Sequence, residues 1–393
     1  MTNSARPCGP PYFTACFAIM PDAAVISQGT ICRDTYLYSS HPHASIAMDG
    51  DIVVVLNQTR RNRFIFHPPH DPEYRNVVTR SRDQGETWSR PQVAPGYGYS
   101  GTECAGLTTL GSGRMLLNQW RNRWYPLAVG ERSAPEPVQL PDEFVRELVE
   151  SDELDTGGQI AGAPADFAPW ARGHGDSFVH VSEDGGRSFI ATARIDTGLF
   201  HGGYGLRGCV ERPDGSLLLP LNDIPEFCTI YTVVSCDGGL SWRNPSLLAR
   251  QNGHLFTEPA MILTARSNLL CLMRDDATGI MHACRSLDGG GSWSMAEPTG
   301  IEGYPPHLLL LSDGRIFCTY GMRQPEFSIR AVVSEDDGRS WRTDSPIMIR
   351  RRLPNRDLGY PATVLLGDAS LFTVYYCQDD KGVTGVEFTR WRI

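Results

Sequence analysis

The chain of 393 residues is 41% hydrophobic and 21% charged, a composition that is ordinary for a globular protein. Its formal net charge of −9, with no run of Lys and Arg, argues against a nucleic acid or an anionic membrane as its partner. No apolar run reaches the length of a membrane span, and the first residues do not read as a secretory signal, so we expect neither.

The 11 cysteines point to a reducing compartment. Their number is odd, they form no CxxC pair, and most of them lie inside apolar runs. This pattern predicts buried free thiols and a cytoplasmic location, and it argues against a zinc site made of thiolates. No cofactor is expected.

Six hairpins are predicted along the chain. Each begins with polar residues, continues as an apolar strand, turns at a short loop that often contains Asp-Gly, and returns as a second apolar strand. These repeats begin at His41, Glu103, Arg207, Glu258, Pro305 and Tyr360. An extended stretch near Ala24–Arg33 precedes them and is expected to supply the outer strand of the last repeat, which would leave no open sheet edge.

A second motif, S-x-D-x-G-x-[ST]-[WF], recurs between the hairpins. Its five copies are Ser81–Trp88, Ser182–Phe189, Ser235–Trp242, Ser286–Trp293 and Ser334–Trp341. The Asp is expected to accept hydrogen bonds from its own turn, the Gly to permit a positive φ, and the aromatic ring to pack beneath the turn. The last four Asp residues are 53, 51 and 48 residues apart, which gives one period per repeat.

The gap between the first two motifs is longer, 101 residues from Asp83 to Asp184. It contains a segment at 124–170 that is rich in Pro, Ala and acidic residues and fits no strand pattern. Within it, Leu140–Leu154 is predicted to form a short helix. We interpret the segment as an excursion from one repeat that serves as a lid or as a contact between copies of the chain.

Together these repeats predict an all-β fold: a single six-bladed β-propeller over residues 1–393 with an inserted, helix-containing loop. The motifs resemble the Asp-box (BNR) repeats of the sialidase superfamily over nearly the whole chain outside the insertion. Propellers of this kind also include other hydrolases, lyases and binding modules, so the resemblance speaks more strongly for the fold than for one activity.

The starts of innermost propeller strands converge on one end of the central channel. Here these starts carry large polar side chains, which predicts a binding site for a small molecule or an oligosaccharide. The expected substrate-binding residues from this pattern are His41, His43, Glu103, Arg207 and His307.

The resemblance to sialidases implies roles for further residues. Glu258, in FTEPAM, and Tyr360, in LGYPATV, match the base and the nucleophile of the family. Asp71 falls where the acid/base residue is expected, although an Asp before Pro is also a common turn residue. These three are the predicted catalytic residues.

Arginines that bind the substrate carboxylate are also implied. Arg274 and Arg323 follow the second strands of two successive hairpins, and Arg61 follows the first hairpin. Arg330 is a competitor of Arg323. A planar guanidinium suits this task because it binds a carboxylate through two parallel hydrogen bonds.

One departure from the family keeps alternatives open. Its first strand normally begins with Arg-Ile-Pro, whereas this chain has His41-Pro42-His43. A neutral imidazole cannot grip a carboxylate as an arginine does. The leading prediction is a retaining exo-glycoside hydrolase for an acidic or polar sugar; the alternatives are a lyase using His43 or His307, and a propeller that only binds carbohydrate. Two His residues on one strand are too few to predict a metal site.

Overall fold

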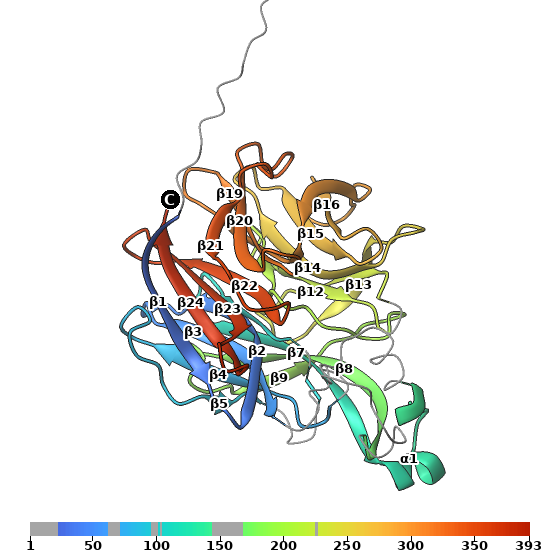
Figure 1. The fold of residues 1–393 in the computed structure, drawn as a ribbon. Coiled ribbons are helices and arrows are strands. Elements are labelled where there is room, and N and C mark those ends of the chain that lie inside the picture. The colour runs from blue at the N-terminus through green and yellow to red at the C-terminus, as the bar shows by residue number, and fades with distance from the viewer. Residues whose placement is uncertain (1–22, 62–70, 96–100, 103, 144–167, 225–226) are drawn as a thin grey trace, which may run out of the picture.

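The computed structural model describes residues 23–61, 71–95, 101–102, 104–143, 168–224 and 227–393. In this part of the chain, strands β1 to β24 form six separate four-stranded antiparallel sheets. The sheets are arranged in a ring as the blades of a propeller (Figure 1). The predicted all-β, six-bladed fold is therefore confirmed.

Each blade runs from an innermost to an outermost strand. Blade one consists of β2 (Leu37–Ile46), β3 (Ile52–Arg60), β4 (Arg75–Ser81) and β5 (Gln92–Val93). Blade two consists of β6 (Gly106–Thr109), β7 (Met115–Pro126), β8 (Trp170–Ser182) and β9 (Ala191–Arg194). Blade three consists of β10 (Val210–Glu211), β11 (Leu217–Asn222), β12 (Ile230–Ser235) and β13 (Arg243–Ala249). Blade four consists of β14 (Phe256–Leu263), β15 (Leu269–Asp275), β16 (Ile280–Ser286) and β17 (Glu297–Glu302). Blade five consists of β18 (Tyr304–Leu310), β19 (Ile316–Met322), β20 (Ser328–Ser334) and β21 (Ile347–Arg350). Blade six consists of β22 (Leu358–Leu365), β23 (Leu371–Gln378), β24 (Thr384–Arg392) and β1 (Ala24–Arg33).

The sixth blade is closed by the N-terminal strand, as predicted. β1 pairs antiparallel with β24, from Ala24 opposite Arg392 to Arg33 opposite Gly385. The guanidinium of Arg33 also forms an ion pair with Glu387 at 3.0 Å, and both side chains are mostly buried. Because β1 covers the outer edge of β24, the ring is sealed by two segments from opposite ends of the chain.

The five Asp-box motifs lie on the turns that follow the third strands of blades one to five. In the first, Ser81 donates a hydrogen bond to Asp83, whose carboxylate accepts the backbone N–H of Thr87, while Ser81 accepts the N–H of Gly85. The serine–aspartate and serine–glycine bonds recur in the other four copies. Each box therefore supplies its own hydrogen-bond partners, as its residue types predict.

The first box also joins two blades. Gly85 has a φ of 99°, and a Cβ added there would lie 2.6 Å from the ring of Phe372 in blade six. The ring centre of Trp88 lies 6.2 Å from that of Phe372 and 6.4 Å from that of Phe388. The glycine and the aromatic residue of the motif thus serve close packing between neighbouring sheets.

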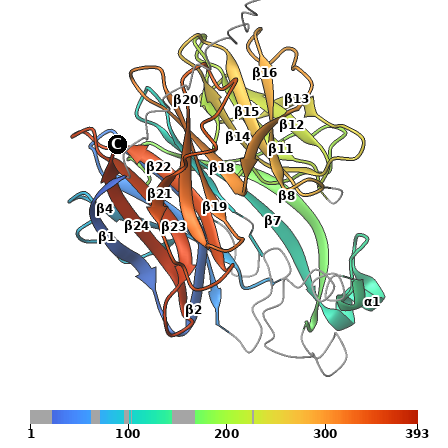
Figure 2. The ribbon, with the colours of Figure 1, turned by 45° about the horizontal axis from the view of Figure 1, so that its top comes forward.

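The insertion differs from its prediction at both ends. β7 and β8 form a long hairpin whose pairing continues through Trp124 opposite Arg172 to Pro126 opposite Trp170. It extends beyond the ring and carries the helix α1 (Leu127–Ser133) near its tip (Figures 1 and 2). Strand pairing thus enters the segment that was predicted to lack strands. Of the helix predicted at Leu140–Leu154, residues 141–143 are helical, Leu140 is not, and residues 144–154 lie outside the described part of the chain.

No helix in the described part of the chain combines the length and the apolar character needed to cross a membrane. The nine described cysteines are free thiols, most of them buried, which agrees with the pattern of their sequence positions.

Candidate active site

Three innermost strands share a bulge near their starts. At this bulge stands a residue that precedes proline and has a positive φ: His41 (50°), Glu258 (51°) and Tyr360 (48°). The strand pairing shifts register at the same three places. A positive φ is rare outside glycine, costs energy, and concentrates at functional sites. The shared X-Pro pattern therefore marks three equivalent positions, of which two are predicted catalytic residues.

Glu258 and Tyr360 form a buried pair across the channel. The hydroxyl of Tyr360 donates a hydrogen bond to Oε1 of Glu258, and the side chains belong to blades four and six. Burial, followed by the negative charge of Glu258, raises the pKa of Tyr360 well above its ordinary value. At neutral pH the tyrosine is thus a neutral phenol that is already bonded to a proton acceptor.

The imidazole of His41 packs against the ring of Tyr360. Its ring centre lies 4.1 Å from that of Tyr360, with an edge-on orientation, and 5.0 Å from that of Tyr376. Its Nδ1 lies 2.7 Å from the hydroxyl of Ser40. His41 therefore occupies the wall of the site next to the tyrosine.

Arg274, at the end of β15, approaches Glu258 from the other side. Its Nη1 lies 3.1 Å from Oε2 of Glu258, and its Nε lies 2.5 Å from Asp276. The guanidinium also stacks over the ring of Tyr304, 4.0 Å from its centre. Glu258 thus has one oxygen engaged by a phenol and the other by a cation.

Arg323 lies beside the same aromatic rings. Its Nε donates to the carbonyl of Leu358 at 2.9 Å and its Nη2 donates to the hydroxyl of Tyr376 at 2.9 Å. Its guanidinium lies 5.6 Å from the ring centres of both Tyr304 and Tyr360. Among the described residues, Nη1 of Arg323 and Nη2 of Arg274 have no hydrogen-bond partner, so each arginine keeps a donor for an anionic ligand.

The position of Arg323 differs in one respect from its prediction. Arg274 pairs with Thr257, and the equivalent residue in blade five, which pairs with Tyr304, is Gly321. Arg323 thus lies two residues beyond the strand position that corresponds to Arg274. Its competitor Arg330 belongs to β20, where its guanidinium binds Ser328 and the carbonyl of Glu326.

Asp71 and Arg61 come from the connection between β3 and β4. Asp71 is buried and accepts hydrogen bonds from the Thr59 hydroxyl (3.0 Å) and the backbone N–H of Glu73 (2.8 Å). Burial raises its pKa to about 6. Arg61 donates to the carbonyl of Gly382. In the described structure neither side chain is hydrogen-bonded to Glu258 or Tyr360.

His43, His307 and Arg207 lie deeper in the channel. His43 and His307 follow the strand bulges of blades one and five, and their ring centres are 5.5 Å apart. Nδ1 of His43 accepts the backbone N–H of Leu107 at 3.0 Å, and Nδ1 of His307 accepts that of Thr363 at 3.3 Å. Both imidazoles therefore bind a backbone N–H within the innermost strand of the next blade. Glu103, the remaining predicted ligand, lies outside the described residues.

Three asparagines on the second strands of blades one to three connect successive blades. Nδ2 of Asn57, Asn118 and Asn222 donates to the carbonyl of Thr102, Gly205 and Phe256, respectively. Only Asn222 also reaches a predicted catalytic residue: its Oδ1 accepts the backbone N–H of Glu258 at 2.8 Å. Asn222 is fully buried and holds the bulge that aims the glutamate.

Sequence reasoning missed Asn222, Tyr304 and Tyr376. A partial signal for two of them is register: Asn57, Asn222, Arg274 and Tyr376 stand at the same position of the second strand in their blades. That position faces the channel mouth, and it changes from asparagine to Arg274 and Tyr376 on the side where Glu258 and Tyr360 lie. Tyr304 carries no such signal.

One cluster has the residue types of a metal site. His254, Asp275 and His282 place potential ligand atoms within 4.8 Å of one another. However, the Asp275 carboxylate already accepts hydrogen bonds from Leu255 N, Ala277 N, the Thr278 hydroxyl and His254. Since the acceptor positions of the Asp275 carboxylate are filled, we interpret the cluster as a hydrogen-bond network that anchors two loops.

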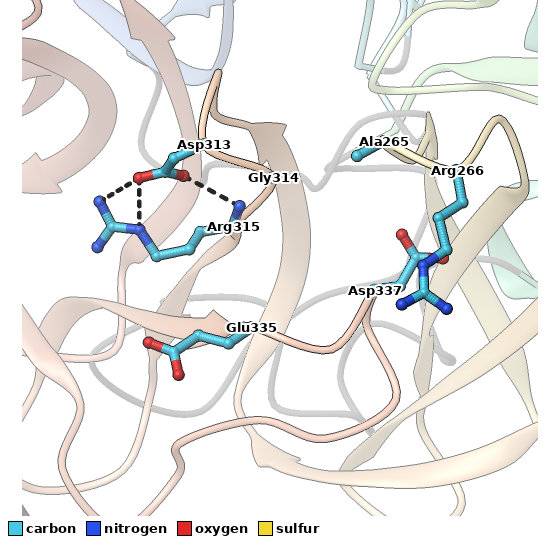
Figure 3. Close-up of a pocket in the computed structure, with 7 residues that line it drawn as sticks. All are labelled: Ala265, Arg266, Asp313, Gly314, Arg315, Glu335 and Asp337. Atoms are coloured by element: carbon cyan, nitrogen blue, oxygen red, sulfur yellow. Dashed lines mark hydrogen bonds and ion pairs between the residues drawn. The ribbon is translucent and has the colours of Figure 1, made fainter.

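A separate surface pocket lies at the other end of the blades (Figure 3). Its lining comes from the β14–β15 turn, the β18–β19 turn and an Asp box, and comprises Ala265, Arg266, Asp313, Gly314, Arg315, Glu335 and Asp337. Because β14 and β18 run from the Glu258 end toward these turns, the pocket is remote from the Glu258–Tyr360 pair. Its open, mixed-charge lining resembles solvated surface.

The chain matches the model of a known family. The model of the BNR repeat-like domain matches residues 164–373, which is more than half of the chain. A search of curated proteins finds no match.

Solved structures with the same fold include proteins of different kinds. A protein of unknown function from Dyadobacter fermentans is 21% identical, with 95% of this chain and 100% of that chain covered and a TM-score of 0.77. A mutant of the NanB sialidase from Streptococcus pneumoniae is 14% identical, with 95% and 71% covered and a TM-score of 0.64. A leech intramolecular trans-sialidase is 12% identical, with 92% and 70% covered and a TM-score of 0.62. At these identities the likeness concerns the fold.

Proposed function

The chain belongs to the BNR repeat-like family of sialidase-like propellers, and we propose that it is a retaining exo-glycoside hydrolase that acts on an acidic or otherwise polar sugar. The observation that carries this proposal is the buried hydrogen bond between Tyr360 and Glu258. A phenol held against a carboxylate is an activated nucleophile, and it is neutral, so it does not repel an anionic sugar. Glycosidases with a tyrosine nucleophile are a known exception to the rule of two catalytic carboxylates.

The reaction proceeds in two displacements. In the first, Oη of Tyr360 attacks the anomeric carbon, Glu258 accepts the phenolic proton, and Asp71 protonates the oxygen of the departing group as the glycosidic bond breaks. In the second, water attacks the same carbon, Asp71 accepts its proton, the bond to Tyr360 breaks, and Glu258 returns the proton to the phenolate. Two inversions at one carbon give net retention of configuration.

The preference for an acidic sugar rests on the arginines. Among the residues that the structure describes, Arg274 and Arg323 each hold one guanidinium nitrogen without a partner, while their other nitrogens are fixed by Glu258, Asp276, Leu358 and Tyr376. A carboxylate between them would receive charge-assisted hydrogen bonds from two oriented cations. The arginine that begins the first strand in the family is replaced by His41 or His43, which suits weaker binding of a carboxylate or binding of a different anionic group.

A lyase has less support. Its base would have to be His43 or His307, and each uses Nδ1 to accept a backbone N–H of the next blade. Burial lowers the pKa of both imidazoles well below the ordinary value. A buried, weakly basic imidazole committed to the fold is poorly suited to abstract a substrate proton.

The test is turnover of aryl glycosides. Wild-type protein is incubated with aryl glycosides of several acidic sugars and of neutral sugars, and the configuration of the first product is read by proton NMR. Hydrolysis of an acidic glycoside with retention supports the proposal. An unsaturated product that absorbs in the near ultraviolet would instead identify a lyase, and binding without turnover across a glycan panel would identify a carbohydrate-binding propeller.

The pH dependence of kcat/KM is expected to reflect Asp71. Its pKa is raised to about 6 by burial, and it must be protonated to act as the acid. The acid is therefore present below pH 6, and kcat/KM should fall about tenfold per unit above it. Asp71→Asn should remove this limb and cost about 10²-fold or more with poor leaving groups. The exposed control Asp344→Asn should keep the wild-type profile; an unchanged profile in Asp71→Asn would exclude Asp71 as the acid.

Asn222 is expected to act as a positioning residue. Asn222→Ala leaves the buried N–H of Glu258 without an acceptor, which should destabilise the fold by about 1–3 kcal/mol. It should also lower kcat about 10- to 100-fold, because Glu258 would lose its fixed orientation. Asn118→Ala removes a contact of the same kind, from an asparagine amide to a backbone carbonyl, between blades two and three, and it serves as the control. It should lower the thermal midpoint while kcat stays within about threefold; equal kcat losses in both variants would contradict the role.

A further inference from the structure

Within the described structure, the channel below the Glu258–Tyr360 pair contains buried donors without acceptors. Nη1 and Nη2 of Arg207 and Nε2 of His43 are buried and have no hydrogen-bond partner among the described residues. Nε of Arg207 is held by the carbonyl of Pro306 at 2.8 Å, which directs the guanidinium across the channel from blade three to blade five. Unpaired donors in the interior are costly and call for a partner.

The protonation of the imidazoles makes the site donor-rich. Because Nδ1 of His43 accepts a backbone N–H, the proton of its neutral ring lies on Nε2. The same argument places the proton of His307 on its Nε2. Arg207 acts electrostatically on both rings, and burial together with this cation lowers the pKa of each well below its usual value. Both rings are therefore neutral donors around one cation.

The charge of Arg207 is not matched by a dedicated partner among the described residues. Glu258 is the carboxylate that acts on it most strongly, but both oxygens of Glu258 are already engaged by Tyr360 and Arg274. Burial lowers the pKa of Arg207 to about 10, so the guanidinium remains charged at neutral pH. The region thus combines a cation that lacks a dedicated counter-ion among the described residues with buried N–H donors of Arg207 and His43 that have no acceptor there.

We propose that Arg207 and His43 bind a small monovalent anion of the halide class inside the channel, below the Glu258–Tyr360 pair. The ligand is monovalent because one cation compensates it, since both imidazoles are neutral. It is small because the donor nitrogens are shielded from solvent. A water molecule is a weaker fit, because it accepts two hydrogen bonds and leaves the positive charge uncompensated. The site is distinct from the sugar site and does not depend on the proposed hydrolysis.

The test measures anion-dependent stability of the full chain. The thermal midpoint is recorded in sodium gluconate and again with chloride or bromide substituted at constant ionic strength. We expect a rise that grows with the logarithm of the halide concentration above the dissociation constant and reaches about 3 °C at about 100 times that constant. Arg207→Met should abolish the rise. Arg266→Met, which removes an exposed arginine at the other end of the blades, should retain it.

A second measurement uses wild-type protein alone, in case Arg207→Met does not fold. Crystals grown with bromide should show an anomalous peak within hydrogen-bond distance of Arg207 and His43. A midpoint that is independent of halide, together with water or no density at the site, would overturn the proposal, as would an unchanged halide response in Arg207→Met. Because neither readout involves sugar turnover, an inactive hydrolase would leave this result unaffected.

Discussion

Tyr360→Phe is expected to lower kcat for an acidic aryl glycoside by about 10³-fold or more. The substitution keeps the ring that packs against His41 but removes the hydroxyl that is hydrogen-bonded to Glu258. Without that oxygen no covalent bond to the sugar can form, and the remaining rate comes from substrate binding and from Asp71. The measurement is steady-state kinetics, with substrate affinity determined separately by calorimetry.

The matched control is Tyr375→Phe, one residue before Tyr376 on β23. Its hydroxyl is also buried, but it is hydrogen-bonded to Thr389 at 2.9 Å within the sixth blade. This variant should keep kcat within about threefold of wild type, because it loses one hydrogen bond remote from the pair. If Tyr360→Phe hydrolyses the glycoside at the rate of Tyr375→Phe, Tyr360 is not the nucleophile.

Glu258→Gln is expected to lower kcat by about 10²- to 10⁴-fold, the usual contribution of a general base. The amide still occupies the position beside Tyr360 and Arg274, but it cannot accept the phenolic proton. KM should change much less than kcat, because the donors proposed to bind the substrate belong to Arg274 and Arg323. Steady-state kinetics of the purified variant separates the two parameters.

Asp276→Asn provides the comparison for this substitution. Asp276 is the other carboxylate that contacts Arg274, at 2.5 Å from its Nε, and it has no contact with Tyr360. Its removal changes the charge around the arginine and leaves the phenol–carboxylate bond in place, so kcat should fall no more than about tenfold. Similar kcat losses in Glu258→Gln and Asp276→Asn would show that Glu258 acts through the charge of Arg274 and is not a base.

The fold could be predicted from the sequence because its signals are local. An Asp box contains the residues that form its own turn: Ser81, Asp83 and Gly85 make their hydrogen bonds within eight residues. Five such turns, evenly spaced apart from the one gap that contains the insertion, leave few architectures other than a propeller. The extent of β7 and β8 could not be read in this way, because the composition of 124–170 resembles a loop and strand pairing overrides it up to Pro126.

The site was only partly predictable, because channel geometry depends on strand register. Glu258, Tyr360 and Arg274 were selected from motif context, and the structure brings them into one cluster. The different surroundings of His41 and His43 were not predictable, since a bulge between Ser40 and His43 interrupts the alternation that would assign their sides. Likewise, the sequence places Arg323 near the end of a strand, but it does not show that Arg323 lies two residues beyond the strand position that corresponds to Arg274.

The closure of the ring by β1 has a consequence for how the chain reaches its native state. β1 is synthesised before every other strand, yet its only neighbour in the sheet is β24. Contacts between segments this distant in sequence form late, because the loop between them must first be ordered. Five blades can be assembled from neighbouring segments as they leave the ribosome, whereas the sixth has to wait for the last strand. Until then the first strand remains an unpaired edge that must be kept from associating with other chains.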